Sequence, residues 1–597
     1  MRILLITTSY NGLCQRAHIE LEDQGHEVSI TLSLSEDEMR MAVLLFQPDL
    51  IVCPFLKEKI PDDIWQGHRC IIIHPGIRGD RGPSSLDWAI IDNLSEWGVT
   101  ALEAAAEMDA GDIWASHQFP MREASKASIY RREVTQAAMK AIGETVRKLG
   151  LADIAPQPLN YSDPTVCGRL RPAMKQESRN IDWTRDDTAT IVRKIRAADS
   201  APGVLDTLCG EDFHLYDAHI EDQLRGAQPK DIIAQRDDAI CVATLDGALW
   251  ISHLRRKGRG PIKLPAALLL GAHLNQVPHV PVTLMPENSL RTFREIWYEE
   301  ANDIGYLHFD FHNGAMSTAQ CRRLLESYAR VAARPVKVLV LMGGTDFWSN
   351  GIHLNMIEAA TNPAEESWHN INAINDLVLA IINTPSKLTV SAMWGSAGAG
   401  GAIMPLAADQ VWARAGCVLN PHYKTMGLYG SEYWTYLLPK RVGPGVALEL
   451  TESTLALGTR KAMRIGLIDR ILPDAHPGYA MTVRAAAEAL ATRADYAELL
   501  AQKARARAHD ERIKPLRLYR DAELQKMHAQ FHDIHGAYHM LRHRFVHKLK
   551  PIETGRVLAK HRRFDATNFN ELRQALGIGL PDMLQPVAAV EVSLEHA

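Results

Sequence analysis

Short apolar runs alternate with amphipathic stretches through the first 150 residues of the chain. The apolar runs cover residues 3–7, 27–32, 50–53 and 70–73, and apolar positions recur at helical spacing over 14–24 and 36–46. This alternation predicts βαβ units on a mostly parallel sheet. In such sheets ligands bind beyond the carboxyl ends of the strands, and His74 directly follows the run that ends at Ile73. We therefore expect His74 to lie where a catalytic residue would.

Two further regions follow with different patterns. A connection rich in proline and polar residues, 155–164, precedes a helix predicted at about 187–197 and strands around 213–220, 239–244 and 247–253. Residues 271–289 hold three prolines and little periodicity, which is typical of a linker. Beyond it, strands predicted at 304–311, 336–342 and 388–393 alternate with helical segments, and a charged helical region after about residue 482 leads to a poorly patterned tail beyond Asp582. Because 597 residues exceed a single core, we expect an α/β multi-domain protein with domains at 1–160, 161–275 and 285–597.

Charge and cysteine content exclude several classes of protein. The 66 Lys and Arg residues are balanced by 71 Asp and Glu residues, so we expect no nucleic-acid partner, which would favour a strong basic excess. The eight cysteines form no CxxC pair, which predicts reduced thiols in a cytoplasmic protein. No stretch approaches the roughly 20 apolar residues needed to cross a bilayer, and the first apolar run is too short for a signal peptide. We expect no membrane association.

Three short motifs in the first domain carry candidate chemistry: His74-Pro75-Gly76, Arg81-Gly82 and Met108-Asp109-Ala110-Gly111. In this order they resemble the active-site signature of the folate-dependent formyltransferases. The resemblance implies 10-formyl-tetrahydrofolate as formyl donor, His74 as an imidazolium that stabilises the oxyanion, and Asp109 as its orienting or proton-relaying partner. It also implies a small OB-like second domain that helps to frame the folate site, and folate contacts at Arg81, Gly82, Thr100 and Gly111.

The chain departs from the formyltransferase pattern at two positions. Ile72 stands where that family has an Asn, and Leu102 stands in place of its second histidine. Losing one oxyanion donor costs about two to three orders of magnitude in rate. A backbone amide, or the hydroxyl of Ser84 or Ser85, would then have to substitute.

A glycine-rich turn far downstream, Gly398-Ala399-Gly400-Gly401, follows the segment 347–354. Together they resemble a degenerate crotonase (enoyl-CoA hydratase/isomerase) site. The resemblance places a thioester oxyanion hole at the backbone amides of Ile352 and Gly400, with CoA contacts at Gly351 and Gly401. Glycine suits the second amide because the backbone must approach the thioester closely at a helix N-terminus.

Alkene hydration requires two carboxylates, but the matching positions carry Ile403 and Tyr423. The domain is therefore not expected to be a hydratase. The segment 420–433 instead offers a phenol, an imidazole and one carboxylate. Formyl-CoA has a single hydrogen on its carbonyl carbon, so a base that removes it as the thiolate leaves yields carbon monoxide, and Tyr423 with Glu432 would carry this proton work. The alternative is that Tyr423 only packs and that the domain only binds CoA.

Two side-chain patterns near the C-terminus are open to more than one interpretation. Arg512 and Arg517, in a basic run from 503 to 517, would meet the CoA phosphates or form a solvated helix face. Histidines recur at three- and four-residue steps, which predicts one helical face, at positions 528, 532, 535, 539, 543 and 547. Without cysteine or a carboxylate cluster beyond Asp533, we expect a packed or solvated face and no metal site.

The fusion of these two halves resembles the HypX family of hydrogenase maturation factors over nearly the whole chain. The resemblance implies a two-step enzyme that passes formyl from 10-formyl-tetrahydrofolate to CoA and then releases carbon monoxide from formyl-CoA. The carbon monoxide would become a ligand of the iron in a [NiFe]-hydrogenase, with other maturation proteins as partners. Two alternatives remain: a CoA-binding or scaffolding crotonase domain beside folate chemistry alone, and a formyltransferase acting on an amino sugar or a methionyl-tRNA.

Overall fold

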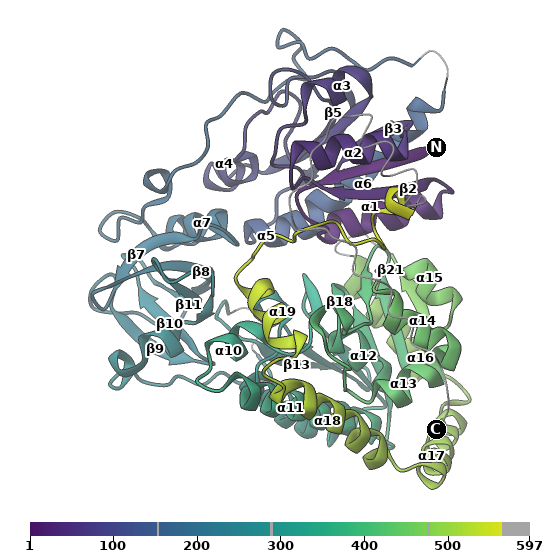
Figure 1. The fold of residues 1–597 in the computed structure, drawn as a ribbon. Coiled ribbons are helices and arrows are strands. Elements are labelled where there is room, and N and C mark those ends of the chain that lie inside the picture. Colours follow the sequence, from purple (N-terminus) through teal and green to yellow (C-terminus); the bar gives the residue numbers. More distant parts are fainter. Residues whose placement is uncertain (152–153, 287–289, 474–477, 564–597) are drawn as a thin grey trace.

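The computed structural model describes residues 1–151, 154–286, 290–473 and 478–563. The tail expected beyond Asp582 lies outside these residues. Three regions, each with its own sheet or sheets, follow one another along the chain (Figure 1). Among the described helices, none combines the length and apolar character that crossing a bilayer requires.

The first region holds a six-stranded sheet in the order β2-β1-β3-β4-β5-β6. Its first four strands are parallel and its last two antiparallel, as β1 (Arg2–Thr7), β2 (Glu27–Leu32), β3 (Leu50–Cys53), β4 (Cys70–His74), β5 (Glu96–Glu103) and β6 (Ile113–Pro120). Its main helices are α1 (Gly12–Asp23), α2 (Glu36–Phe46), α3 (Asp62–Gly67), α4 (Ser85–Ile91), α5 (Lys126–Ile129) and α6 (Thr135–Leu149). The strands and the first two helices confirm the alternation read from the sequence.

The second region is an antiparallel sheet in the order β7-β8-β11-β10-β9, with β12 paired to β11. Helix α7 (Thr188–Ala198) packs on it, and the Asp187 side chain caps that helix by accepting a hydrogen bond from Thr190 N. The strands are β7 (Val204–Leu208), β8 (Glu211–Glu221), β9 (Ile232–Arg236), β10 (Ala239–Ala243), β11 (Ala248–Arg256) and β12 (Leu264–Pro265), and α8 (Ala266–Leu270) follows them.

The third region contains two sheets whose strands alternate along the chain. The larger sheet comprises β13 (Ile296–Ala301), β14 (Ile304–Phe309), β15 (Val338–Met342), β17 (Leu388–Met393), β19 (Gln410–Arg414) and β22 (Arg470–Leu472). The smaller sheet comprises β16 (Phe347–Ser349), β18 (Ser396–Gly398), β20 (Val418–Asn420) and β21 (Leu457–Gly458). Three times a strand of the larger sheet is followed by one of the smaller sheet, so the chain winds as a repeated spiral.

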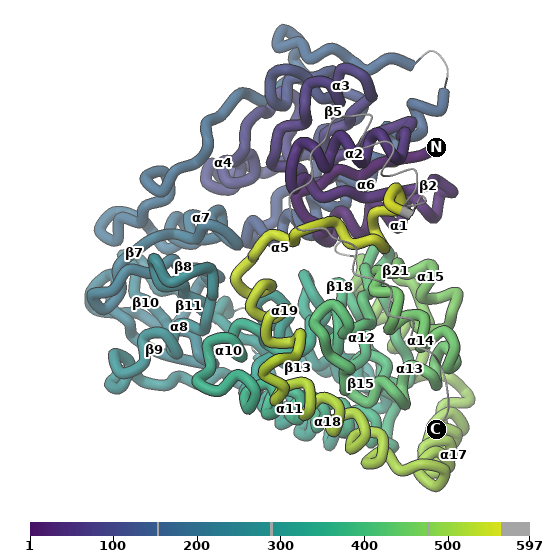
Figure 2. The backbone as a smooth tube through the Cα atoms, viewed as in Figure 1, coloured from purple at the N-terminus to yellow at the C-terminus, as the bar shows by residue number. Residues whose placement is uncertain are grey.

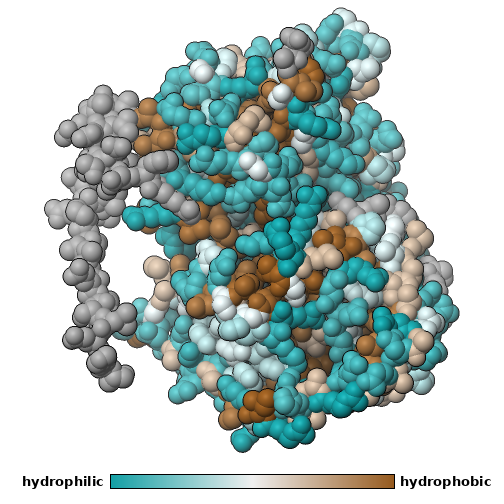
Figure 3. All heavy atoms as spheres, turned by 90° about the vertical axis from the view of Figure 1, so that its right-hand side faces the viewer, coloured by the Kyte–Doolittle hydropathy of each residue, from teal (hydrophilic) through white to brown (hydrophobic). Residues whose placement is uncertain are grey.

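Helices surround these two sheets. They are α9 (Thr318–Ala332), α10 (Leu354–Ala359), α11 (Pro363–Ile382), α12 (Gly400–Ile403), α13 (Trp434–Val442), α14 (Pro444–Ser453), α15 (Thr459–Arg464), α16 (Gly478–Ala491), α17 (Tyr496–Ile513), α18 (Leu516–His532) and α19 (Ala537–Val546). The expectation of one continuous histidine-bearing face was wrong: α18 ends at His532 and α19 begins at Ala537, so the histidines are divided between two helices and a turn. In Figure 3, hydrophobic side chains gather near the middle of one otherwise largely hydrophilic face.

The segment after α19 returns to the first region (Figure 2). Along the outer edge of β2, Leu32 N donates to Thr554 Oγ1 at 2.9 Å and Ile30 N donates to the carbonyl of Leu558 at 3.1 Å. His561 N also donates to Ser29 Oγ at 3.2 Å. An edge strand exposes unpaired backbone groups, and this segment covers them. It therefore ties the third region to the first.

Candidate active sites

His74, the last residue of β4, lies between two aspartates. Its Nε2 is 2.9 Å from Asp80 Oδ2, and its Nδ1 is 3.4 Å from Asp109 Oδ2. His74 and Asp80 are buried. Carboxylates near both ring nitrogens hold the imidazole in one orientation. Asp80 was missed by the sequence analysis, because it belongs to none of the recognised motifs.

The loop that carries Asp109 is held by the residues predicted to bind folate. Arg81 Nε donates to the carbonyl of Met108 at 2.9 Å, and Gly82 N donates to Asp109 Oδ2 at 3.2 Å. Asp109 itself has a φ of 55°, a left-handed conformation that needs such support. Arg81 and Gly82 therefore fix the aspartate that faces His74.

Thr100 and the glycines shape the other side of this site. Thr100 is paired with His74 across β4 and β5, and its Oγ1 donates to the carbonyl of Gly76 at 2.9 Å. A Cβ at Gly76 would overlap the His74 ring and the Asp80 carboxylate, so glycine is needed there. Gly111 likewise packs directly on the Glu103 carbonyl.

The two departures from the formyltransferase pattern face each other in the sheet. Ile72 on β4 is the register partner of Leu102 on β5, so both polar groups are replaced at one place. Of the two serines suggested as substitutes, Ser85 Oγ donates its hydrogen to the Pro75 carbonyl at 2.8 Å, whereas Ser84 Oγ accepts from Met174 N at 3.0 Å and keeps its own hydrogen for another acceptor.

A second site lies where the two sheets of the third region meet. Gly400 is the first residue of α12, and the first N–H groups of a helix have no intrahelical acceptor. Gly351, with a φ of 74°, lies against it: a Cβ there would be 3.4 Å from Gly400 N. A Cβ at Gly401 would clash with the Ser349 carbonyl. The structure thus brings the predicted segments 349–352 and 398–401 together through close backbone contacts.

Tyr423 and Glu432 are joined by a hydrogen bond in the same site. The Tyr423 hydroxyl lies 2.7 Å from Glu432 Oε2 and 3.2 Å from the Ser431 carbonyl. Burial raises the pKa of Glu432 to about 7, and burial with the neighbouring carboxylate raises the pKa of Tyr423 well above its usual value. Glu432 can therefore exchange a proton near neutral pH while Tyr423 stays a neutral donor.

Behind this pair lies a third buried carboxyl group that the sequence analysis missed. Glu523 on α18 accepts hydrogen bonds from Ser431 Oγ at 3.3 Å and Thr435 N at 2.8 Å. Burial raises its pKa to about 7. Asn375 on α11 accepts from Glu432 N at 2.8 Å, so elements distant in sequence fix the position of Glu432.

A cavity of about 1130 Å³ opens onto the second site. All three regions contribute to its lining, which includes Gln15, Arg131, Lys263, Ile352, Gly400, Tyr423 and Glu432. This volume lies at or above the upper end for ligand pockets. Arg131 connects the first and third regions: its Nη1 is 3.1 Å from Asp346 Oδ2, and its Nη2 donates to Asn313 Oδ1 at 3.1 Å.

Two predicted CoA contacts lie elsewhere. Arg512 at the end of α17 and Arg517 on α18 are exposed and do not line the cavity. The cationic groups that do line it are Arg131, Arg255, Lys263 and Lys548. His74, Asp80 and Asp109 are also absent from the described lining, so the two sites occupy separate places.

Three family models match successive parts of the chain. The model described as formyl transferase matches residues 10–146, and that for the formyl transferase C-terminal domain matches 173–268. The enoyl-CoA hydratase/isomerase model matches 300–555.

One relative decides the family. The hydrogenase maturation factor HoxX of Bradyrhizobium diazoefficiens is 46% identical over 94% of this chain and 97% of its own. The chain belongs to the HypX/HoxX family of hydrogenase maturation factors. A solved HypX from Aquifex aeolicus, in complex with tetrahydrofolic acid, agrees with it at a TM-score of 0.91 and 44% identity, covering 95% of this chain and 99% of that one.

Membership of the HypX family confirms the resemblance and the α/β multi-domain fold class. The N-terminal part is also similar to the methionyl-tRNA formyltransferase of a Geobacillus species, at 27% identity over 43% of this chain and 80% of that protein. The match to HoxX extends over both halves, so the fusion itself is the family's feature.

Proposed function

We propose that this chain is a carbon monoxide-producing maturation enzyme of a [NiFe]-hydrogenase. It transfers formyl from 10-formyl-tetrahydrofolate to the CoA thiol and then decarbonylates formyl-CoA. The observation that carries the proposal is the buried Tyr423–Glu432 pair at the wall of a large cavity, in a chain that also holds His74 between two aspartates.

The first step takes place at His74. The CoA sulfur attacks the formyl carbon, and the resulting oxyanion is stabilised by the imidazolium between Asp80 and Asp109. Collapse of this intermediate breaks the bond to the folate nitrogen, which takes up the proton that the thiol has lost. Folate as donor is supported by the tetrahydrofolic acid complex of Aquifex aeolicus HypX.

CoA occupies the cavity during the second step. Its thioester oxygen accepts from the amides of Ile352 and Gly400, and cationic groups such as Arg131 and Lys548 meet its phosphates. The basic run in the sequence suggested Arg512 and Arg517 for the phosphate contacts, but the exposed position of both residues favours the cavity lining instead. The long pantetheine arm allows the thiol to move between two separate sites.

Decarbonylation needs a base and a proton donor for the leaving thiolate. Glu432 removes the single hydrogen of the formyl carbon as a proton, and the electrons of the C–H bond remain on carbon. The electrons of the C–S bond leave with sulfur. The products are carbon monoxide and CoA, with the thiolate protonated through Tyr423 and the protonated Glu432. A pKa near 7 makes Glu432 suited to this exchange.

A second candidate is a folate-dependent formyltransferase or hydrolase whose crotonase domain only binds CoA. It is favoured by one observation: His74 does not line the described cavity. The two candidates differ in whether carbon monoxide is formed.

The test is to mix purified protein with 10-formyl-tetrahydrofolate and CoA, with deoxymyoglobin as the carbon monoxide trap. Carbon monoxide that disappears without CoA, or in His74→Ala, supports the two-step enzyme. Tetrahydrofolate and formate without carbon monoxide support the second candidate.

A further inference from the structure

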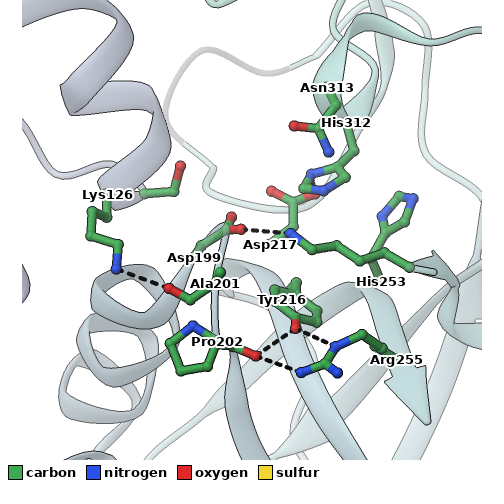
Figure 4. A network of polar contacts seen from close by, with 12 residues as sticks. Lys126, Asp199, Ala201, Pro202, Tyr216, Asp217, His253, Arg255, His312 and Asn313 are labelled. Atoms are coloured by element: carbon green, nitrogen blue, oxygen red, sulfur yellow. Dashed lines mark hydrogen bonds and ion pairs between the residues drawn. The ribbon is translucent and has the colours of Figure 1, made fainter. Parts of the chain in front are cut away.

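A cluster of one aspartate and two histidines lies at the junction of the second and third regions. Asp217 is on β8, His253 is on the neighbouring strand β11, and His312 follows β14. In Figure 4 the Asp217 carboxylate and both imidazole rings gather at one place. Both His253 and His312 line the large cavity.

The three side chains have the separation that a shared ion requires. Each offers one ligand atom, and these atoms all lie within 4.8 Å of one another. His312 Nδ1 is 3.6 Å from Asp217 Oδ2, and the His253 and His312 rings stack with centroids 4.3 Å apart. A metal ion at about 2.0–2.2 Å from each ligand atom would draw them slightly closer.

His312 is the member of the cluster whose ring lacks hydrogen-bond partners among the described residues. Its Nε2 is buried without a hydrogen-bond partner, and its Nδ1 is too far from Asp217 for a hydrogen bond. Among the described residues, no other group accepts from or donates to this ring. Leaving a buried polar group without a hydrogen-bond partner is unfavourable. A metal ion would bind the ring nitrogen lone pair of His312, which no protein group uses.

His253 has a lone pair available as well. The Ser252 hydroxyl forms a short hydrogen bond with Asp217 Oδ2 and lies 2.8 Å from His253 Nδ1. A hydroxyl has one hydrogen, and Ser252 gives it to the carboxylate, so His253 Nδ1 must be the donor to Ser252. The lone pair of His253 then resides on Nε2. Such outer hydrogen bonds are typical of histidines that bind metals.

Asp217 is held in place for the same role. Its Oδ1 is 3.0 Å from His219 Nε2, and its backbone adopts the left-handed conformation with a φ of 57°. A non-glycine residue in this region persists only where its surroundings impose it, and such positions cluster at functional sites.

The charge around the cluster also suits a cation. Lys263 lies nearby, but its Nζ is 3.3 Å from Asp199 Oδ1, which balances its charge. Asp217 therefore leaves the cluster with a net negative charge when both histidines are neutral.

We propose that Asp217, His253 and His312 bind one divalent transition-metal ion of the Zn²⁺ or Fe²⁺ class in the wall of the cavity. Two imidazoles and one carboxylate are a donor set that these ions prefer, and three protein ligands leave at least one coordination position for a water or ligand. Because the three residues are far apart in sequence, no spacing motif reveals the site. The proposal does not depend on the formyl-transfer function.

The test uses the full chain after treatment with a chelator, titrated with Co²⁺ and followed by visible absorption. We expect one equivalent of Co²⁺ per chain, with d–d bands that Zn²⁺ displaces. Asp217→Asn and His253→Ala should each weaken binding by at least about tenfold. Failure of the wild-type protein to take up Co²⁺ overturns the proposal.

A surface cluster supplies the matched control. Glu358, His543 and His547 also lie close enough to share an ion. His543→Ala should leave the spectrum unchanged. Loss of the spectrum in His543→Ala, with retention in His253→Ala, assigns the ion to the surface and contradicts the proposal.

A stability measurement distinguishes the loss of metal binding from misfolding of a variant. His312→Leu removes a ring without hydrogen bonds, so the variant should fold with an unchanged or higher Tm in the absence of metal. Zn²⁺ should raise the Tm of the wild-type protein, because an ion that binds the native state stabilises it, but not that of His312→Leu. An equal rise in both proteins overturns the proposal.

Discussion

The Tyr423 hydroxyl lies 2.7 Å from Glu432 Oε2, and both side chains are buried at the edge of the same cavity. The pair comes from two sides of one loop that precedes α13, and Glu432 has a left-handed φ of 60° that turns it toward Tyr423. The Glu432 backbone thus adopts an uncommon conformation at the place where its side chain meets Tyr423.

Replacing Tyr423 with Phe should separate the two proposed steps. We expect carbon monoxide formation to fall by about a hundredfold or more, because positioned proton transfer contributes about 10²–10⁴-fold. Tetrahydrofolate release in the presence of CoA should continue. The measurement is the ratio of carbon monoxide to tetrahydrofolate in one reaction.

Tyr429 provides the control for this substitution. It is a neighbouring tyrosine that does not line the cavity, so Tyr429→Phe should leave the ratio unchanged. Equal ratios in Tyr423→Phe and in the wild-type protein would mean that the phenol has no chemical role and would support the CoA-binding alternative.

The raised pKa of Glu432 predicts a pH dependence with a definite sign. Its folded pKa of about 7 exceeds the ordinary value of 4.5, so the native state holds the proton more tightly than the unfolded state. The free energy of unfolding therefore decreases as the pH rises between these two values, and Glu523 contributes in the same direction. Carbon monoxide formation should instead increase through pH 7, because the base must be ionised.

Thermal unfolding between about pH 5 and pH 8 measures the decrease in the free energy of unfolding. In Glu432→Gln the decrease should be smaller, since one of the two carboxyl groups no longer titrates. A decrease of the same size in this variant would show that Glu432 is not a source of the pH dependence.

The regular elements were predictable where one physical signal dominated. Helix 36–46 and strand 388–393 have the predicted bounds, and Ser35 marks the start of the helix by accepting a hydrogen bond from Glu38 N. The prediction of a single helical face for the histidines was wrong because Gly536, shortly after Asp533, marks the break between α18 and α19. The three- and four-residue spacing of the histidines does not reveal this break.

The supporting groups of both sites could not be read from the sequence. Asp80 reaches His74 only because the turn at Gly76 reverses the chain within six residues. Glu523 lies on a highly charged helix about 90 residues beyond Ser431, and nothing in its neighbourhood distinguishes a buried carboxylate from an exposed one. Such contacts are set by packing rather than by local pattern.

Asp80 should prove as important as the residues of the recognised motifs. Asp80→Asn removes the charge that orients His74, and we expect the turnover number for tetrahydrofolate formation to fall by about a hundredfold. The KM for the folate should change little, because Asp80 holds the histidine rather than the substrate. Steady-state kinetics with CoA in excess measure both values.

Two controls accompany this variant. Asp92→Asn alters an aspartate of the same domain that pairs with Arg171, and formyl transfer should persist. Formyl-CoA supplied directly should still yield carbon monoxide in Asp80→Asn. Loss of that second reaction would indicate general misfolding and would contradict a local role.

The last prediction concerns Gly400, whose backbone lies against the carboxylate of Glu432. A Cβ at this position would clash with the carboxylate of Glu432, so Gly400→Ala should displace Glu432 from Tyr423. Carbon monoxide formation from formyl-CoA should fall at least as far as in Tyr423→Phe, while formyl transfer continues. Gly445→Ala, which meets nothing within 4 Å and also lies near a helix start, should behave like the wild-type protein. If Gly400→Ala retained full decarbonylation, the close contact between the glycine turn and Glu432 would have no part in the second step.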